Sequence, residues 1–185
     1  VESLDLMATS ADGAVPVVPD DAAVVLLAGP TTALSGHETD ALVSFISRGG
    51  GLIVGQDPGS ENLQLLSRMG IGIPSGVASD TRVVFPFWDR PIPNVRAHVL
   101  TESLRSAGLV PVLSHIAPIN ISKSIPKSFK VSPLLTTSRK GWIERGGELI
   151  EGAPTYDEGI DGQGPVTMAV AVEIRPGTEW VSSGS

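Results

Sequence analysis

Two apolar runs separated by an amphipathic stretch form the clearest pattern in the chain. Residues 22–28 are continuously apolar over the length of a strand, which is typical of a strand buried on both faces of a parallel sheet. Ser35 and Glu38 have the spacing of a capping box, so a helix is expected to begin directly after the serine and to end at Gly49. A second apolar run, Leu52–Val54, follows this helix. The pattern therefore predicts a strand–helix–strand unit with two parallel strands.

The rest of the chain has weaker periodicity. A second helix is expected between Ser60 and Gly70, followed by a short strand at 71–73, and proline and glycine interrupt the chain beyond Pro74. We predict one α/β domain over residues 1–185, built on a doubly wound, mainly parallel sheet, with a loop-rich second half from about residue 74. Further strands are predicted at 83–85, 109–113, 131–136 and 166–174, and a glycine-rich acidic loop at 151–164.

Composition excludes several classes of function. The core must be aliphatic, because 41% of the residues are hydrophobic and only 4% are aromatic. A formal charge of -7 argues against a nucleic acid as partner, since phosphate backbones are bound by clustered basic residues. The chain has no cysteine, which excludes thiol nucleophiles, disulfides and cysteine metal sites within it. It begins at Val1 inside an alternating stretch, and we expect it to be a segment of a longer protein.

The best-placed candidate ligand site lies where the two predicted parallel strands end. Thr31 and Thr32 follow the first strand, and Asp57 and Ser60 follow the second. Ligands of open α/β sheets bind outside the carboxyl ends of the strands, so these four residues could line a crevice. Turn formation and helix capping explain the same residues and are the favoured interpretation.

No catalytic residue, metal or cofactor is predicted. The glycines at 49–51 follow a helix and precede a strand, whereas a phosphate-binding loop follows a strand and opens a helix. The G-x-S-x-G pattern of a nucleophile elbow is absent from the sequence. The three histidines, none with a partner at the spacing of a metal site on one helix, are His37, His98 and His115.

Two further groups of residues allow more than one interpretation. Asp157, Glu158 and Asp161 share the acidic loop but lack the alternating register of a calcium site, so a solvated loop is favoured over a cation site. Trp88 and Trp142 lie in loop regions and either anchor an interface or cover the edge of the core.

Several stretches resemble a known family. The stretch Val24–Pro58, VVLLAGPTTALSGHETDALVSFISRGGGLIVGQDP, is similar to the auxiliary, extracytoplasmic domain of ABC-type transport systems related to the gliding-motility proteins. Ser132–Ser138 followed by Trp142, and the stretch Gly164–Val172, resemble later segments of that family. The resemblance implies a flavodoxin-like fold similar to class I glutamine amidotransferases, held outside the cell membrane beside an ATP-driven permease. The amidotransferase activity does not carry over, because its cysteine nucleophile is missing.

The leading hypothesis from the sequence is a non-catalytic domain of an ABC-transporter accessory protein at the extracytoplasmic face of the cell membrane. It would act in substrate capture or protein assembly, with permease and ATPase subunits or other membrane-assembly proteins as partners. The alternative is a sugar- or nucleotide-binding module, or a hydrolase, that uses the crevice at the strand ends. A third possibility is a purely structural scaffold, for which a large exposed apolar patch is the expected sign.

Overall fold

The computed structural model describes residues 2–6, 17–60, 64–146 and 153–174. The chain divides into two compact units. The first unit groups residues 1–56, 60–68 and 176–185, and the second groups 57–59 and 69–175. That residues 1–185 act as one domain stays a prediction.

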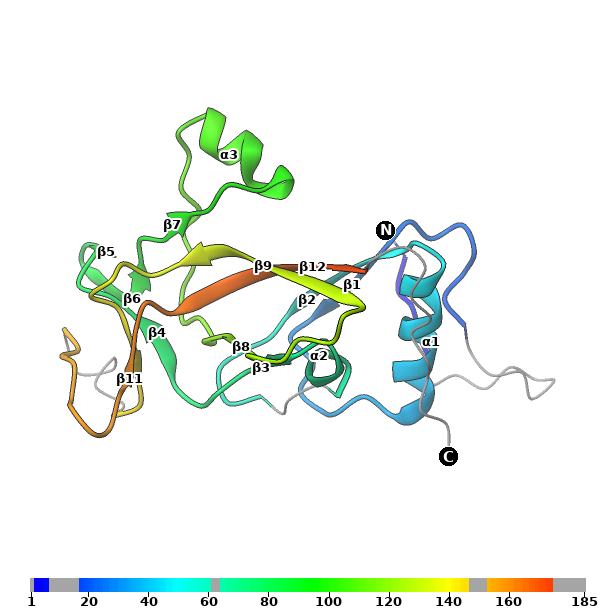
Figure 1. The fold of residues 1–185 in the computed structure, drawn as a ribbon, viewed down its shortest axis with the longest axis horizontal. Helices are drawn as coiled ribbons and strands as arrows, with labels where there is room; N and C mark the ends of the chain where they lie inside the picture. The colour runs from blue at the N-terminus through cyan, green and yellow to red at the C-terminus, as the bar shows by residue number, and fades with distance from the viewer. Residues whose placement is uncertain (1, 7–16, 61–63, 147–152, 175–185) are drawn as a thin grey trace. The chain divides into compact units, whose positions relative to one another are not determined.

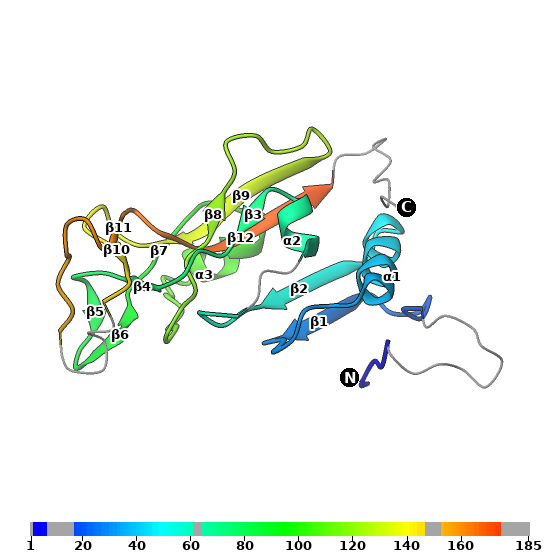
Figure 2. The ribbon, with the colours of Figure 1, turned by 90° about the horizontal axis from the view of Figure 1, so that it is seen from below.

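The first unit contains the predicted strand–helix–strand arrangement. Strand β1 (Val24–Ala28) pairs in parallel with β2 (Gly51–Gly55), and helix α1 (Gly36–Ser47) connects them. Figure 2 shows α1 beside the two strands. The short helix α2 (Gln64–Arg68) lies within the segment predicted to be helical, of which residues 61–63 are outside the described residues. The parallel unit is therefore confirmed.

Local hydrogen bonds explain where α1 begins and ends. The amide of Glu38 donates to Ser35 Oγ at 3.2 Å, and the amide of Ser35 donates to Glu38 Oε2 at 2.8 Å, which completes the capping box. At the other end, Gly49 has a φ of 96°, a left-handed conformation that glycine adopts without strain. The next residue, Gly50, passes so close to the Phe45 ring that a Cβ there would overlap it.

The two parallel strands do not have both faces buried, as their continuous apolar sequence had predicted. Val24, Leu26 and Ile53 are 56%, 65% and 58% exposed, whereas the residues between them are half-buried. A continuous apolar run fits burial on two faces, but the run by itself does not supply the second covering layer. The described residues thus leave one face of this small sheet apolar and exposed.

The second unit consists mainly of short antiparallel sheets, shown in Figure 1. The longest pairing joins two eight-residue strands that run from Thr136 opposite Thr167 to Phe129 opposite Ile174. The sheets have the strand orders β12–β9–β7, β11–β10–β4, β3–β8 and β5–β6. Their strands are β3 (Ile71–Gly72), β4 (Val77–Ser79), β5 (Val83–Val84), β6 (Phe87–Pro91), β7 (Asn94–Val95), β8 (Asn120–Ile121), β9 (Phe129–Thr136), β10 (Trp142–Glu144), β11 (Gly162–Gln163) and β12 (Thr167–Ile174).

The doubly wound, mainly parallel sheet predicted from the sequence is therefore wrong, and so is the flavodoxin-like fold similar to class I glutamine amidotransferases. Among the described residues, β1 and β2 form the only parallel pair, and every other named pair is antiparallel. The physical reason is the length of the connections. A parallel pair needs a crossover of about a dozen residues or more, usually helical, whereas an antiparallel pair can be joined by a tight turn. After β2 the chain is divided by prolines and glycines into pieces that form turns.

The individual strand predictions had mixed outcomes. Strands are present at 83–84, 129–136 and 167–174, close to three of the predicted positions. The strand predicted at 109–113 is wrong, because this segment has no strand structure and follows a short helix. Pro111 interrupts the run, and the amide of Leu109 donates to the carbonyl of Leu104 at 2.8 Å, which closes the end of that helix.

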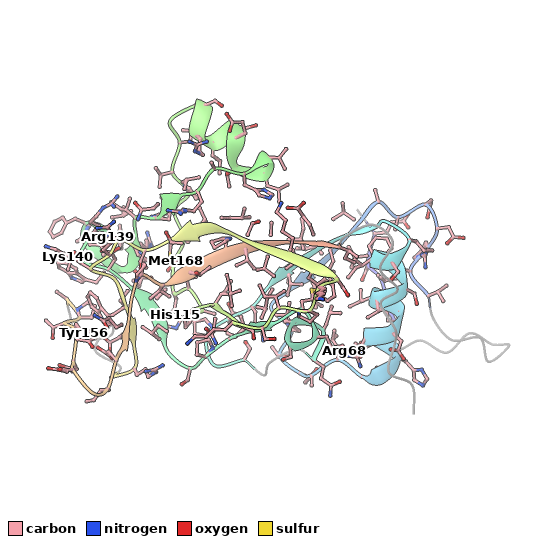
Figure 3. All side chains as sticks on the ribbon, viewed as in Figure 1. Arg68, His115, Arg139, Lys140, Tyr156 and Met168 are labelled. Atoms are coloured by element: carbon pink, nitrogen blue, oxygen red, sulfur yellow. The ribbon has the colours of Figure 1, made fainter. Side chains whose placement is uncertain are left out.

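The core of the second unit lies between the long strand pair and β4. Its buried cluster comprises Ala78, Leu135, Val166 and Met168. Met168, labelled in Figure 3, is 5% exposed. Ala78 lies on β4, Leu135 on β9 and Met168 on β12, and Val166 directly precedes β12. The cluster therefore joins sheets whose strands are far apart in sequence.

The backbone around Gly141 is packed tightly against this core. A Cβ at Gly141 would overlap the Thr137 side chain and lie 2.8 Å from the carbonyl oxygen of Ser79. Thr137 is 1% exposed, and its hydroxyl accepts a hydrogen bond from the amide of Val166 at 2.7 Å. Only a glycine fits at position 141 without moving these groups.

The acidic loop has a buried polar anchor. Asp161 is 8% exposed and accepts hydrogen bonds from the amides of Arg145 at 3.0 Å and Asp157 at 2.9 Å. The prediction of a solvated loop is therefore wrong for Asp161, whose carboxylate fixes two backbone segments instead. No group of three or more possible metal ligands occurs within the described residues.

Trp142 lies inside the core. It is 3% exposed, and its indole Nε1 donates to Glu144 Oε2 at 3.0 Å. The other oxygen of this carboxylate accepts from the amide of Gly146 at 2.6 Å. Of the two interpretations of Trp142, the structure supports the core.

Candidate functional site

The predicted ligand residues follow two strand ends that do meet. Ala28 is opposite Gly55 in the parallel register, and the amide of Gly29 donates to the Gly55 carbonyl at 2.9 Å. Thr31 and Thr32, on the loop after β1, are exposed.

On the loop after β2, Asp57 is exposed and Ser60 is half-buried. Asp57 groups with the second unit, whereas Ser60 and both threonines group with the first. The four residues thus do not belong to one compact unit. A ligand role for them stays a prediction.

A different segment carries the most distinctive exposed surface. The segment from Arg96 to Leu113, here called the arm, connects β7 to the chain before β8 and contains the 3-10 turn η1 (Val99–Thr101) and helix α3 (Glu102–Ser106). In Figure 1, α3 stands away from the β12–β9–β7 sheet of the same unit. Five large apolar side chains of the arm are exposed: Val99 at 83%, Leu100 at 67%, Leu109 at 59%, Val110 at 48% and Val112 at 60%.

Side chains at the start of the arm hold its first turn. Thr101 is 4% exposed, and its hydroxyl donates to the carbonyl of Arg96 at 2.6 Å. The amide of Leu100 donates to His98 Nδ1 at 3.2 Å, so the histidine caps the turn. Two exposed apolar residues, Val99 and Leu100, therefore lie on a turn whose backbone is fixed on both sides.

The beginning of the arm is attached to the long strands. The amide of Arg96 donates to the carbonyl of Leu134 on β9 at 2.8 Å. His98 Nε2 lies 3.5 Å from Glu173 Oε1 on β12, and Lys130 Nζ lies 2.8 Å from the same oxygen. The hydrogen bond from Lys130, and then the one from His98, lower the pKa of Glu173 below its ordinary value of 4.5.

The end of the arm is attached to β6. The hydroxyl of Ser114 makes a short hydrogen bond to the carboxylate of Asp89, and the amide of His115 donates to the Asp89 carbonyl at 3.0 Å. His115, labelled in Figure 3, has a φ of 50°, so the chain turns sharply there. With both ends attached, the arm presents its apolar side chains on a held backbone.

The helix within the arm contributes little to the apolar surface. None of its residues is buried, and Arg105 Nη1 pairs with Glu102 Oε2 at 3.3 Å. These two opposite charges cancel on the helix, so α3 itself offers no net charge to a partner. The apolar residues flank the helix on both sides in the sequence.

This surface was not predicted, because the run LVPVL at 109–113 was expected to be a strand. Two signals in the sequence could have indicated otherwise. Gly108, with a φ of 63°, ends the helix directly before the run, and Pro111 interrupts it. His98 and His115 had no predicted role; His98 helps to attach the start of the arm, and His115 lies two residues after its end, where its amide bonds to Asp89.

The fold of this chain is similar to that of a solved structure. The described residues combine one parallel strand–helix–strand unit with a larger set of short antiparallel sheets. A solved structure of the mmIFT52 N-terminal domain is similar, with a TM-score of 0.51 and 19% sequence identity. The match covers 66% of this chain and 60% of that chain, so the present chain spans somewhat less than two thirds of that chain's length. At this identity the likeness concerns the fold alone.

The other comparisons found no match: neither a protein-family model nor a curated protein matches the chain. The antiparallel sheets, together with the likeness to a domain of an intraflagellar transport protein, contradict the amidotransferase-like fold and remove the fold argument for an ABC auxiliary domain. Within the part of the chain that the structure describes, no helix has the length and apolar character required to cross a membrane.

Proposed function

We propose that this chain is an assembly module that binds a partner protein through the arm. The observation that supports the proposal is the combination of five exposed apolar side chains with a backbone attached at both ends. Large exposed apolar side chains are typical of interaction sites when they gather on one surface, and these five lie on one continuous segment of the chain. A held backbone lowers the entropy lost on binding, because fewer conformations have to be given up.

The expected partner surface is an apolar groove. Fully burying one aliphatic side chain stabilises a complex by about 1.5–3 kcal/mol. The five side chains are about half to four fifths exposed, so their burial supplies on the order of 5–10 kcal/mol before the cost of association. The apolar contacts can therefore drive binding, and polar contacts at the rim would set its specificity.

A protein fits this surface better than a polyanion. Glu102 and Arg105 neutralise each other on α3, and the chain as a whole is acidic. A nucleic acid would need a cluster of basic residues, which the exposed part of the arm does not offer.

The proposal keeps one part of the hypothesis drawn from the sequence, namely protein assembly. The permease and ATPase subunits as partners, and a place at the extracytoplasmic face of the cell membrane, stay predictions. Their fold argument is gone, and they now depend on the sequence resemblance alone.

Two variants with matched exposure test the proposal. Leu100→Ser/Val112→Ser alters the arm at residues that are 67% and 60% exposed, and Leu26→Ser/Ile160→Ser alters residues elsewhere that are 65% and 56% exposed. A photo-crosslinking amino acid at position 99 in the native cell identifies the partner, and calorimetry with the purified partner measures its affinity for each variant.

We expect the arm variant to lose at least about tenfold in affinity, equivalent to about 1.4 kcal/mol, while the control variant binds as the unaltered chain does. Equal affinities for the two variants would show that the arm is not the binding surface. Thermal unfolding of both variants checks that neither loss comes from unfolding. Sedimentation velocity of the chain alone shows whether the groove belongs to a second copy, an outcome that would contradict a separate partner.

A further inference from the structure

The first turn of the arm depends on a hydrogen bond whose acceptor can gain a proton. The amide and the hydroxyl of Thr101 donate to backbone carbonyls, of His98 at 3.0 Å and of Arg96 at 2.6 Å. The amide of Leu100 donates instead to His98 Nδ1 at 3.2 Å. A carbonyl oxygen accepts whatever the pH, whereas a ring nitrogen accepts only while it carries no hydrogen. The cap on Leu100 therefore requires a neutral His98 ring.

The other ring nitrogen of His98 indicates the same tautomer. His98 Nε2 lies 3.5 Å from Glu173 Oε1 on β12. An ionised carboxylate can only accept, so the hydrogen of the neutral ring is on Nε2. The His98 side chain is 12% exposed, and both of its nitrogens are engaged. The ring thus donates through Nε2 and accepts through Nδ1.

Protonation of this ring removes the cap. A charged imidazolium carries hydrogen on both nitrogens, so no orientation of the ring can accept from the Leu100 amide. The contact between Nε2 and Glu173 persists and becomes an ion pair, which keeps the ring where its Nδ1–H faces the Leu100 N–H. Two donors that face each other repel. The protonated state therefore gains an ion pair and loses the hydrogen bond that holds the turn.

The charged groups around the ring do not titrate together with it. Lys130 Nζ on β9 lies 2.8 Å from the same Glu173 oxygen, and the pKa of Glu173 is lowered below 4.5 by Lys130 first and then by His98. Within the arm, the two charges of α3 pair with each other, and Arg96 is exposed. Histidine titrates at about pH 5–8, whereas lysine and arginine titrate well above that range. A change of the turn within this range therefore reports a histidine.

We propose that protonation of His98 opens the first turn of the arm, so that Val99 and Leu100 are held in place at neutral pH and not at acidic pH. The consequence for binding rests on the proposed function. A turn that is no longer held loses more entropy when a partner binds, so the arm binds its partner more weakly in acid. The switch itself needs no partner, because all the bonds that change lie within the second unit.

Amide exchange of the chain alone tests the switch. NMR shifts of the His98 ring follow its protonation over about pH 5–8, and the exchange rate of the Leu100 amide is compared at each pH with that of an unstructured chain. We expect the protection of Leu100 to fall at least about threefold as the ring gains its proton, which is the size expected for a lost cap. The His115 amide, which donates to the Asp89 carbonyl, should keep its protection. Unchanged protection of Leu100 while His98 titrates would overturn the proposal.

Two variants separate the cap from the charge. His98→Asn places a side-chain oxygen as many bonds from the backbone as Nδ1, and asparagine is a favoured cap that does not titrate. It should protect Leu100 equally across this pH range. His98→Ala should leave Leu100 weakly protected at every pH. If His98→Asn shows the same pH dependence as the unaltered chain, another group causes the effect and the proposal fails.

Binding measurements distinguish this inference from the proposed function. Calorimetry with the partner found by crosslinking at position 99 should give at least about threefold weaker binding at about pH 5.5 than at about pH 7.5, and His98→Asn should abolish this difference. If Leu100→Ser/Val112→Ser binds as strongly as the unaltered chain, the proposed function fails while the exchange result stands. If that variant loses binding but His98→Asn weakens in acid as the unaltered chain does, the arm is the binding surface and regulation by His98 is wrong.

Discussion

Asp80 offers the sharpest test of how the second unit is held together. Its carboxylate, 3% exposed, accepts a hydrogen bond from the amide of Arg82 at 3.0 Å and one from the hydroxyl of Ser138 at 2.8 Å. A further, short hydrogen bond comes from the amide of Ser138. The substitution Asp80→Asn keeps the shape of the side chain but replaces one acceptor oxygen with an NH2 donor.

The cost of this substitution follows from counting donors. With either orientation of the new amide, its NH2 group faces a backbone N–H, of Ser138 in one case and of Arg82 in the other. One hydrogen bond to a charged acceptor is lost, which costs about 1.5–3 kcal/mol, and the remaining bonds weaken because the acceptor is now neutral. We expect Asp80→Asn to lower the free energy of unfolding by about 2–4 kcal/mol, a large part of the 5–15 kcal/mol typical of a domain.

Urea unfolding followed by far-UV circular dichroism measures this loss, and hydrogen exchange of the Ser138 and Arg82 amides localises it. The control is Asp40→Asn on the exposed side of α1, which should change the stability by less than about 0.5 kcal/mol. Because the chain has two compact units, the fit should allow two transitions. A loss below about 0.5 kcal/mol for Asp80→Asn, or unchanged exchange of both amides, would refute the reasoning.

Three further predictions concern other positions. Gly141→Ala should destabilise the second unit by about 1–3 kcal/mol in urea unfolding, because a Cβ has no room there. The control Gly72→Ala should be close to neutral, because no atom lies within 4 Å of a Cβ at that position. Similar losses at both sites would contradict the packing argument. Ser35→Ala should cost about 1 kcal/mol through loss of the α1 cap, and an unchanged urea midpoint would show that the cap is dispensable. Lys130→Met should raise the pKa of Glu173 in an NMR titration, since its hydrogen bond is the main cause of the lowered pKa. Because the pKa is lowered, this contact stabilises the fold above about pH 4.5, and the effect is lost as the pH falls through the pKa of Glu173 in the folded state. A pKa of Glu173 that Lys130→Met leaves unchanged would show that Lys130 is not the cause.

The part of the structure that could be predicted is the part whose interactions are local. The capping box of α1 joins residues three positions apart, and Gly49 ends the helix through its own backbone freedom. The two parallel strands at its ends follow from such local signals, because a helix of this length brings its flanking strands side by side. The doubly wound sheet extended this local success to a parallel sheet that the rest of the chain does not build, whereas the ligand role of Thr31, Thr32, Asp57 and Ser60 stays a prediction.

The candidate site depended on contacts between distant residues. Residues 109–113 of the arm were predicted to be a strand, because an apolar pattern alone does not distinguish a buried run from an exposed one. Its attachment needs His98 to meet Glu173 and Ser114 to meet Asp89, and neither meeting is indicated by spacing in the sequence. The exposure of its five apolar side chains is thus a property of the folded second unit.

The strand–helix–strand unit, the ends of α1 and the mainly aliphatic character of the core could be read from the sequence alone. Each of these follows from hydrogen bonds and sterics within a few residues, or from composition. Tertiary structure alone decided that β9 pairs with β12, that Asp80 binds a residue 58 positions away, and which apolar side chains remain outside. Such pairings compete with many alternatives of similar local preference, and the choice among them is made by packing and hydrogen-bond satisfaction over the whole unit.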